Sequence, residues 1–443
     1  MNIVEMDEKG TPISKMYFSM SVPVVLGMVS TMIYSIADTW FISALGNTNL
    51  IAGVSLNAPV LTILMAFGNI FGQGGTSLIS RLVGKRDHKT SRHVSSACFY
   101  MSVLVGVIAG VVMLIFHTPI LYLLGASEET FAYAYDYYFW LAVGAPVIVI
   151  AFVPYNLIRA EGMANESMIS TIGGTVLNII LDPIFIFGLN LGAAGAAMAT
   201  VLGYLFKDVF CVIMILKKSR ELSLSIKEVT LEKRYIQQIF SVGIPSALTN
   251  IMASISNIFV NQFLLPYGND KIAAMGIALK VANVGQLALI GFSFGGLPLF
   301  GYYVGGGKKE KFMDLLHFCM KFIYSLAIVL SVVLFVFARY FILFFVEDEG
   351  LVASGTLMLR FQVMTLVFVS IVLLMTIVFQ AAGDAREMFF LSISRQGVVF
   401  LIVLFMMSWL AGYYGIIASQ AISDVVSAIF ALVMYQNWKK KQW

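Results

Sequence analysis

Residues 99–116 read FYMSVLVGVIAGVVMLIF, a run without a single charged side chain. Such a run is typical of a helix that crosses a lipid bilayer, which needs about 20 mostly apolar residues. The whole chain has this character: 59% of its 443 residues are hydrophobic and 12% are charged. Soluble domains average about 45–50% apolar and about 25% charged residues. The composition therefore excludes a soluble enzyme, a disordered chain and a nucleic-acid-binding protein.

The same reading along the chain predicts an all-α integral membrane protein with twelve transmembrane helices. The predicted spans are residues 16–43, 50–82, 93–116, 131–154, 163–187, 193–216, 236–265, 271–304, 312–345, 355–381, 388–410 and 413–437. Several of these exceed 25 residues, so we expect them to tilt or kink.

Lysine and arginine alternate between the loops that join these spans. They gather after the second, sixth and eighth spans (residues 81–92, 217–234 and 308–311) and in the tail at 439–441. The loops after the first, third, fifth and eleventh spans hold neither residue. The positive-inside rule then predicts that both termini and the even-numbered loops are cytoplasmic.

The chain repeats itself at an offset near 221 residues. Val22-Pro23 matches Ile244-Pro245, and Phe71–Gly75 matches Phe292–Gly296. Six spans in each half give both copies the same topology, which is typical of transporters built from parallel repeats. The predicted organisation is an N-lobe (1–216), a basic cytoplasmic connector (217–235) and a C-lobe with a basic tail (236–443). The two six-helix lobes would be related by a parallel pseudo-two-fold repeat.

Two acidic residues lie inside predicted spans, Asp38 in the first and Asp182 in the fifth. A charge at mid-bilayer costs at least about 2.5–3.5 kcal/mol, so each favours a functional role. Asn178 lies four residues before Asp182 and shares its helix face. Pro183 removes a backbone donor and loosens the helix there. Thr200 in the sixth span could add a hydroxyl, which would complete an all-oxygen site suited to a hard cation such as Na⁺.

A purely structural role for Asp182 is the alternative, with Pro183 as an ordinary kink. The repeat argues against it, because the equivalents of Asp38 and Asp182 in the second half are Val260 and Val403. A scaffold would more easily be shared by both copies. Two neighbouring carboxylates would also let a proton compete with a metal cation for the same oxygens.

Other polar and aromatic residues of the spans are weaker candidates. The candidates for a substrate cavity are Tyr34, Tyr138, Glu161, Lys280, Gln380 and Asp424. Lys280 and Asp424 could instead pair with each other, and Glu161 could fix a cytoplasmic loop. The aromatic run Tyr133–Trp140 favours an interfacial belt, and the alternative is that some of its rings hold a cationic ligand.

The sequence shows no strong nucleotide-binding or catalytic-metal motif, and its three cysteines lie far apart. We therefore expect no enzymatic activity, disulfide framework, cofactor or zinc site. Transport would then draw its energy from an ion gradient.

Taken together, these features resemble the multidrug and toxic compound extrusion (MATE) family, and above all its bacterial MepA-like branch. The resemblance rests on the first span with Pro23 and Ala37-Asp38-Thr39, the glycine-rich second span, Arg159–Gly162, Asn178–Pro183 and the twelve-span repeat.

This resemblance implies a multidrug efflux antiporter in the bacterial cytoplasmic (inner) membrane. Such a transporter would contribute to antibiotic resistance. It would export organic cations, such as dyes and cationic antimicrobials, in exchange for H⁺ or Na⁺ by alternating access. The family's N-lobe cation site carries over onto Asp38, Asn178, Asp182 and Thr200, with a carbonyl from Ala196 and helix kinks at Pro23 and Pro183. The partners expected are small organic cations and the lipid bilayer but no nucleic acid, and the expected state is a monomer.

The resemblance leaves two further points. Some relatives place an acidic cation site on spans seven and ten, but here span seven has Asn257 and Asn261 and no acid, and span ten has no acid before Asp384. A flippase for a lipid-linked precursor on a similar two-lobe fold remains the alternative function. Its pyrophosphate headgroup would need several buried arginines.

Overall fold

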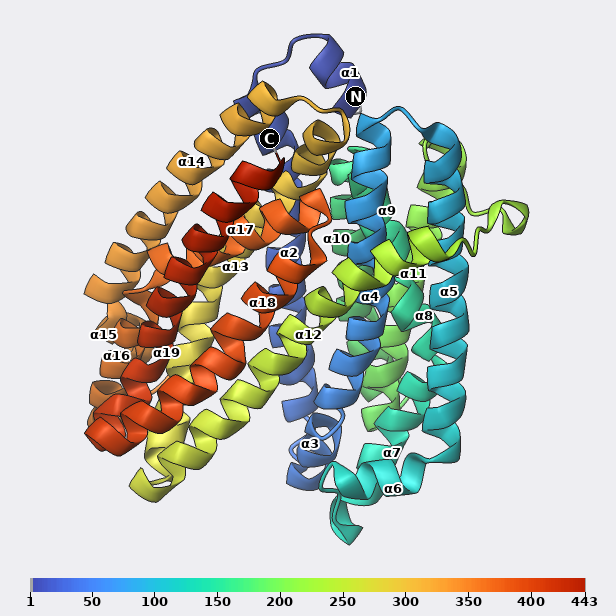
Figure 1. The fold of residues 1–443 in the computed structure, drawn as a ribbon. Helices are drawn as coiled ribbons and strands as arrows, with labels where there is room; N and C mark the ends of the chain where they lie inside the picture. Colours follow the sequence, from blue (N-terminus) through green and yellow to red (C-terminus); the bar gives the residue numbers. More distant parts are fainter. Residues whose placement is uncertain (1–2, 443) are drawn as a thin grey trace. The chain divides into compact units, whose positions relative to one another are not determined.

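The computed structural model describes residues 3–442, with side chains to residue 440, and its regular structure is helical throughout these residues (Figure 1). They form two compact units. The first comprises residues 3–10 and 26–247, and the second comprises residues 11–25 and 248–442. Helices of the first unit are mostly blue to green in Figure 1, and those of the second mostly yellow to red.

The first unit contains α1 (Ile3–Glu8), α3 (Thr48–Ser55), α4 (Ala58–Gly84), α5 (His88–Ile115), α6 (His117–Leu123), α7 (Glu128–Val143), α8 (Ala145–Ile150), α9 (Phe152–Ala160), α10 (Ala164–Pro183) and α11 (Gly192–Lys218). The second contains α13 (Asn269–Gly305), α14 (Lys309–Val336), α15 (Ala338–Leu343), α16 (Glu349–Val363), α17 (Leu366–Ala382), α18 (Ala385–Gln396) and α19 (Val398–Gln442). Two helices contribute to both units, α2 (Ile13–Ser43) and α12 (Lys233–Leu264). Short turns of 3-10 helix cover Ile226–Glu228 and Leu265–Tyr267.

The predicted all-α membrane fold is confirmed. Nine helical segments among the described residues are long and apolar enough to cross a membrane, or eleven if two bent pairs are counted. The last segment, Ala385–Lys440, covers two predicted spans. They are separated at Gly412, whose backbone (φ 52°, ψ −127°) leaves the helix.

The fourth and tenth predicted spans are not continuous helices. The fourth bends by 60° between α7 and α8–α9, where Gly144 precedes Pro146. The tenth bends by 42° between α16 and α17. Hydropathy predicted both segments as apolar, but it carries no information on where a helix breaks.

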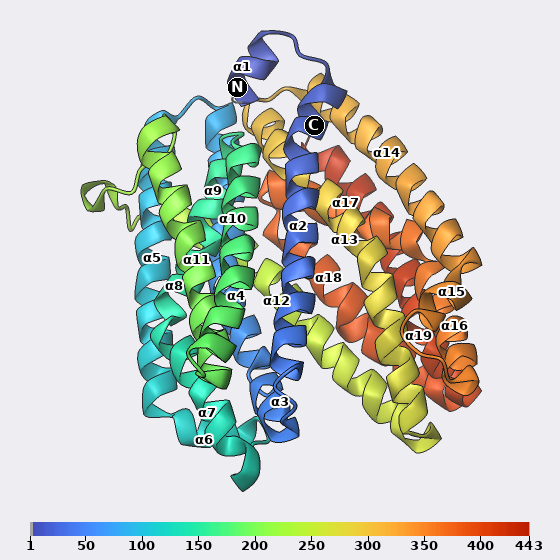
Figure 2. The same ribbon diagram turned by 180° about the vertical axis from the view of Figure 1, so that it is seen from behind.

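Close packing of α10 against α11 places the helices with the predicted cation ligands side by side, as Figure 2 shows. Gly174 and Gly203 face each other at this contact. A Cβ added to Gly174 would lie 2.6 Å from the carbonyl oxygen of Gly203. Small residues of this kind let two membrane helices approach closely. After Pro183, α10 continues as a π-helix, Ile184–Gly188, so the regular helical ladder ends next to Asp182.

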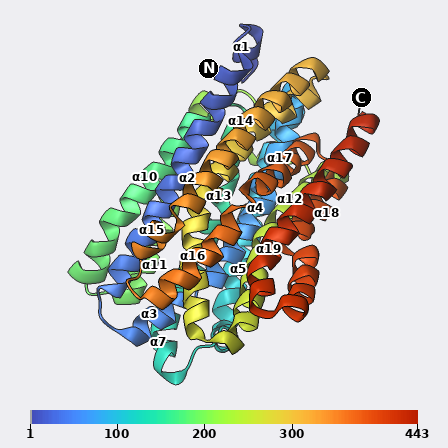
Figure 3. The ribbon, with the colours of Figure 1, turned by 90° about the vertical axis from the view of Figure 1, so that its left-hand side faces the viewer.

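The units differ from the predicted lobes in two segments. Residues 11–25 belong to the second unit, where the Tyr17 hydroxyl donates to the carbonyl of Phe292 (2.8 Å). The Tyr17 ring also contacts Phe318 of α14, which lies along the start of α2 in Figure 3. The start of α12 belongs correspondingly to the first unit, where Phe240 packs on Phe71 of α4. Both boundaries fall two residues after a proline inside the helix, Pro23 and Pro245, where the backbone hydrogen-bond ladder is interrupted.

The contact between α2 and α13 can be tested by substitution of a glycine. In Gly295→Ala, the added Cβ would collide with the Cα of Ser21, which is backbone and cannot turn away. We expect a loss of stability of about 1–3 kcal/mol, as for an overpacked core. The matched control is Gly276→Ala on the same helix, where a Cβ meets nothing within 4 Å. Thermal unfolding in detergent should give a lower midpoint for Gly295→Ala than for Gly276→Ala. Equal midpoints would contradict the close contact between α2 and α13.

Candidate functional site

Three helices of the first unit bring the predicted cation ligands together. Asp38 lies near the end of α2, Asn178 and Asp182 lie on α10, and Thr200 lies on α11. Asp182 is fully buried at 0% exposure, Asn178 and Thr200 are buried, and Asp38 is half-buried. Ala196 is fully buried one helical turn before Thr200.

Thr200 is the hydrogen-bonding centre of this cluster. Its hydroxyl lies 3.0 Å from the hydroxyl of Tyr34 on α2, and it accepts a long bond (3.5 Å) from the Asn178 side-chain amide. One hydroxyl therefore connects α2, α10 and α11. Because the Asn178 NH₂ group is used in this bond, the amide oxygen remains available to a ligand.

The carboxylates, by contrast, lack partners. Both oxygens of Asp182, Oδ1 of Asp38 and Oδ1 of Asn178 are buried without a hydrogen bond from any described residue. No ion pair within residues 3–442 reaches either aspartate. Burying an uncompensated charge is costly, so a buried carboxylate ordinarily finds a cation or a proton.

The two carboxylates also act on one another, since the charge of Asp38 contributes to the electrostatic environment of Asp182. Four side chains therefore contribute three kinds of oxygen: two carboxylates, an amide carbonyl and a hydroxyl. This donor set is hard and carries up to two negative charges. The described residues hold no group of three or more His, Cys, Asp or Glu side chains that could bind a metal ion.

Sequence reasoning missed two tyrosines beside this cluster, Tyr137 of α7 and Tyr204 of α11. Both interact electrostatically with Tyr34, and Tyr137 also with Asp38 and Asp182. Tyr137 belongs to the aromatic run predicted as an interfacial belt, yet it is buried. The signal was present, because Ala134, Tyr137, Tyr138 and Leu141 recur at the spacing of one buried helix face.

Two candidates for the substrate cavity make contacts elsewhere in the first unit. Tyr138 is fully buried, and its hydroxyl donates to the carbonyl of Met113 on α5 (3.0 Å). Glu161 accepts bonds from the Ser219 hydroxyl (2.5 Å) and the Arg220 N–H (2.9 Å). It thus holds the connector, which is the loop-fixing alternative. Burial raises the pKa of Glu161 above its ordinary value, and these two hydrogen bonds oppose that rise.

Of the two options for Lys280 and Asp424, the pairing of one with the other is not found. Asp424 is buried and pairs with Arg395 (3.0 Å), whereas Lys280 is exposed. Their separation along the chain gave no information on which helix faces meet. Gln380 is buried on α17. Among the six candidates, Tyr34 is hydrogen-bonded to one of the predicted cation ligands, Thr200.

The anchoring of the connector can be tested by proteolysis. Glu161→Leu removes both bonds to Ser219 and Arg220, and hydrogen bonds to a charged group contribute about 1.5–3 kcal/mol. We expect trypsin to cleave after Arg220 at least about tenfold faster than in the wild type. Glu166→Gln is the control, because its ion pair with Lys218 is partly exposed and contributes little. Unchanged cleavage in Glu161→Leu would contradict the anchoring.

The comparisons with known proteins identify the family of this chain. A sequence model of the family described as MatE matches the chain twice, over residues 23–184 and 245–406. The starts of the two matches, residues 23 and 245, are separated by close to the offset predicted for the internal repeat. The multidrug export protein MepA of Staphylococcus haemolyticus is 34% identical over 429 residues, which cover 97% of this chain and 94% of that protein. MepA of Staphylococcus aureus is 33% identical over 424 residues, with 96% and 94% covered.

Solved structures show the same fold. A crystal structure of MATE in the bent conformation superposes with a TM-score of 0.90 at 25% identity, covering 97% of both chains. An outward-facing multidrug resistance MATE family transporter gives a TM-score of 0.91 at 24% identity, covering 97% of this chain and 96% of that chain. The chain therefore belongs to the MATE family and is a multi-span membrane transport protein rather than an enzyme.

Proposed function

We propose that this protein is a secondary active multidrug efflux transporter that exports organic cations in exchange for H⁺ or Na⁺ by alternating access. One observation carries the proposal: Asp182 is fully buried, and neither of its carboxylate oxygens has a partner among the described residues. The relatives named multidrug export protein support the type of cargo.

The coupling ion would bind where the unpartnered oxygens converge. Asp38 and Asp182 supply charge, and Asn178 and Thr200 supply neutral oxygens. For Na⁺ these groups would act as ligands, whereas a proton would neutralise one carboxylate. The same residues therefore serve either ion, and occupancy by either removes negative charge from a buried place.

Coupling to conformation would run through α2. This helix carries both Asp38 and Tyr34, and Tyr34 is hydrogen-bonded to Thr200 on α11. Pro23 provides a flexible point within the same helix. An ion that favours one position of α2 over another shifts the population of transport states by its differential affinity.

The proposed membrane and orientation rest on the distribution of basic residues. The basic connector and tail support a protein in the bacterial cytoplasmic membrane with both termini inside. Transport by the monomer is part of this proposal, since the four cation ligands come from one chain.

The flippase alternative needs free buried cations for a pyrophosphate headgroup. Instead, Arg395 is paired with Asp424, and Arg159 donates to Asn156 and lies over the Tyr155 ring. These contacts favour export of cations.

The test is transport in proteoliposomes with the Na⁺ and H⁺ gradients imposed separately. We expect ethidium movement against its concentration gradient with at least one of the two ions, and that ion is then the coupling ion. Movement under neither gradient, together with translocation of a labelled anionic lipid, would overturn the proposal in favour of a flippase.

A further inference from the structure

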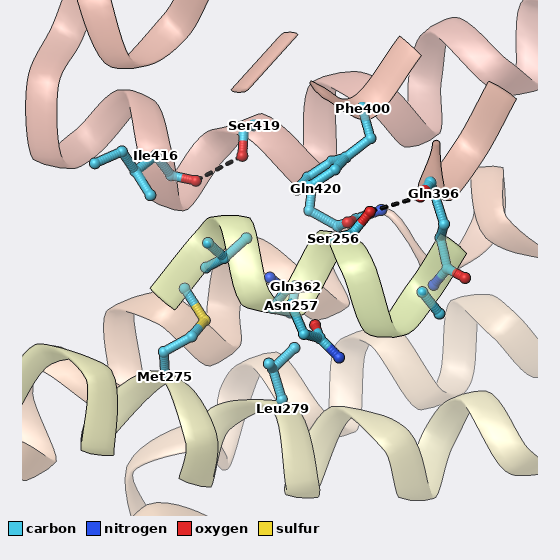
Figure 4. A pocket seen from close by; sticks show the side chains of 12 residues that line it. Ser256, Asn257, Met275, Leu279, Gln362, Gln396, Phe400, Ile416, Ser419 and Gln420 are labelled. Atoms are coloured by element: carbon cyan, nitrogen blue, oxygen red, sulfur yellow. Dashed lines mark hydrogen bonds between the residues drawn. The ribbon is translucent and has the colours of Figure 1, made fainter. Parts of the chain in front are cut away.

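The second unit contains a small cavity of about 30 Å³, distinct from the cation site. It is bordered by α12, α13, α16, α18 and α19 (Figure 4). A space of this size accepts about two water molecules or one small functional group. It is too small for a whole drug molecule.

The polar lining of this cavity consists of uncharged side chains. They are Ser256, Asn257, Gln362, Gln396, Ser419 and Gln420. Carboxamides offer two donor hydrogens and an acceptor oxygen each, and hydroxyls offer both functions. Apolar side chains such as Met275, Leu279 and Phe400 complete the wall. A few placed polar groups in an apolar wall are typical of ligand sites.

Gln362 is the member that points to a ligand. Its side chain is only 6% exposed, yet it makes no hydrogen bond with any described residue. Gln420 donates its amide to Asp424 (3.1 Å), and its amide oxygen has no bond from the described part of the chain. Both amides line the cavity and have unused hydrogen-bonding capacity, so a polar group that enters it could add a hydrogen bond of about 0.5–1.5 kcal/mol net.

Next to the amides of the cavity, Arg395 and Asp424 form a buried ion pair. Asp424 accepts from Arg395 (3.0 Å) and from the Thr365 hydroxyl (2.9 Å), in addition to Gln420. Gln286 also accepts a long bond from Arg395 (3.4 Å). The carboxylate is thereby neutralised, unlike Asp38 and Asp182 in the first unit. The cavity therefore has no net charge to attract a cation.

A helix break positions these groups. Helix α18 ends at Gln396, and Gly397 adopts a non-helical backbone (φ −127°, ψ −117°). The carbonyls freed there are satisfied by hydroxyls: Ser423 donates to Arg395 (3.1 Å) and Ser256 to Gln396 (2.5 Å). The second of these bonds is drawn in Figure 4. The break thus directs Arg395 to Asp424 and leaves the Gln396 side chain at the cavity wall.

We infer that this amide-lined cavity is a subsite for an uncharged hydrogen-bonding group of the transported compound, such as a carboxamide, carbonyl or hydroxyl. The inference rests on the proposed function. It divides recognition between two places, with ions at the acidic cluster and neutral polar substituents at the cavity.

The experiment compares two phosphonium probes that differ in one group. One is tetraphenylphosphonium, and the other carries a carboxamide at position 4 of one ring. Binding to the purified full-length protein in detergent is measured by calorimetry. We expect the wild type to prefer the carboxamide probe. Gln362→Leu should weaken binding of that probe by about tenfold to a hundredfold and leave the parent probe within about twofold.

Gln286→Leu is the matched control, because Gln286 belongs to the same network but does not line the cavity. It should keep the preference for the carboxamide probe. Gln396→Leu serves as a second cavity variant if Gln362→Leu lowers thermal stability. Equal wild-type affinity for both probes, or equal weakening of both probes in the cavity variants, overturns the subsite.

The two proposals fail in different ways. Gradient-driven transport of tetraphenylphosphonium tests the proposed function, whereas the binding preference at equilibrium tests the subsite. Loss of the first with the preference intact rejects the transport proposal alone, and the reverse result rejects the subsite alone.

Discussion

Asp182→Asn is expected to reduce gradient-driven efflux of ethidium by at least about a hundredfold. Asparagine keeps the shape of the side chain but cannot release a proton and carries no charge to hold a cation. Removing one partner of a buried charge interaction costs about 3–5 kcal/mol, and each 1.4 kcal/mol is a factor of ten. Efflux from cells that carry the variant measures the effect.

The stability of the same variant separates lost coupling from misfolding. Both Asp182 oxygens lack partners among the described residues, so asparagine removes an uncompensated buried charge. The thermal midpoint in detergent should therefore stay level or rise. Asp136→Asn is the control, because this exposed carboxylate on α7 lies outside the cluster, and its efflux should match the wild type. Gradient-dependent efflux at the wild-type rate in Asp182→Asn would contradict the role of Asp182.

Arg395→Met is expected to give the largest loss of stability, about 3–5 kcal/mol. It leaves Asp424 buried without its cation, and breaking a buried pair from one side has this cost. The double variant Arg395→Met, Asp424→Leu should recover most of the loss, since apolar side chains often replace a buried pair without penalty. Thermal unfolding of the wild type, Arg395→Met, Asp424→Leu and the double variant in one detergent measures this cycle.

An exposed ion pair provides the comparison for that cycle. Arg339 and Glu349 form an ion pair on the surface of the second unit, in which Nη2 of Arg339 donates to both carboxylate oxygens and both side chains are more than half exposed. Solvent screens such pairs, so Arg339→Met should change the midpoint little. If Arg395→Met proved as mild as Arg339→Met, Asp424 would not depend on Arg395, and the cavity beside it would not be neutral.

Local sequence patterns predict much of the fold. Apolar runs such as 99–116 identify the membrane helices, because lipid requires every backbone polar group to be satisfied within the segment. The motif Asn178–Pro183 likewise identified the acidic site on α10, since helical spacing places Asn178 and Asp182 on one face. Neither inference needed contacts between distant residues.

Three features depend on the tertiary structure. Residues 11–25 pack in the second unit, Tyr137 faces the acidic cluster rather than the interface, and Asp424 pairs with Arg395 instead of Lys280. Each depends on where a helix bends and how it is rotated about its axis. Hydropathy measures only how apolar a segment is, so it determines that a helix lies in the membrane. Packing against other helices determines which of its side chains meet.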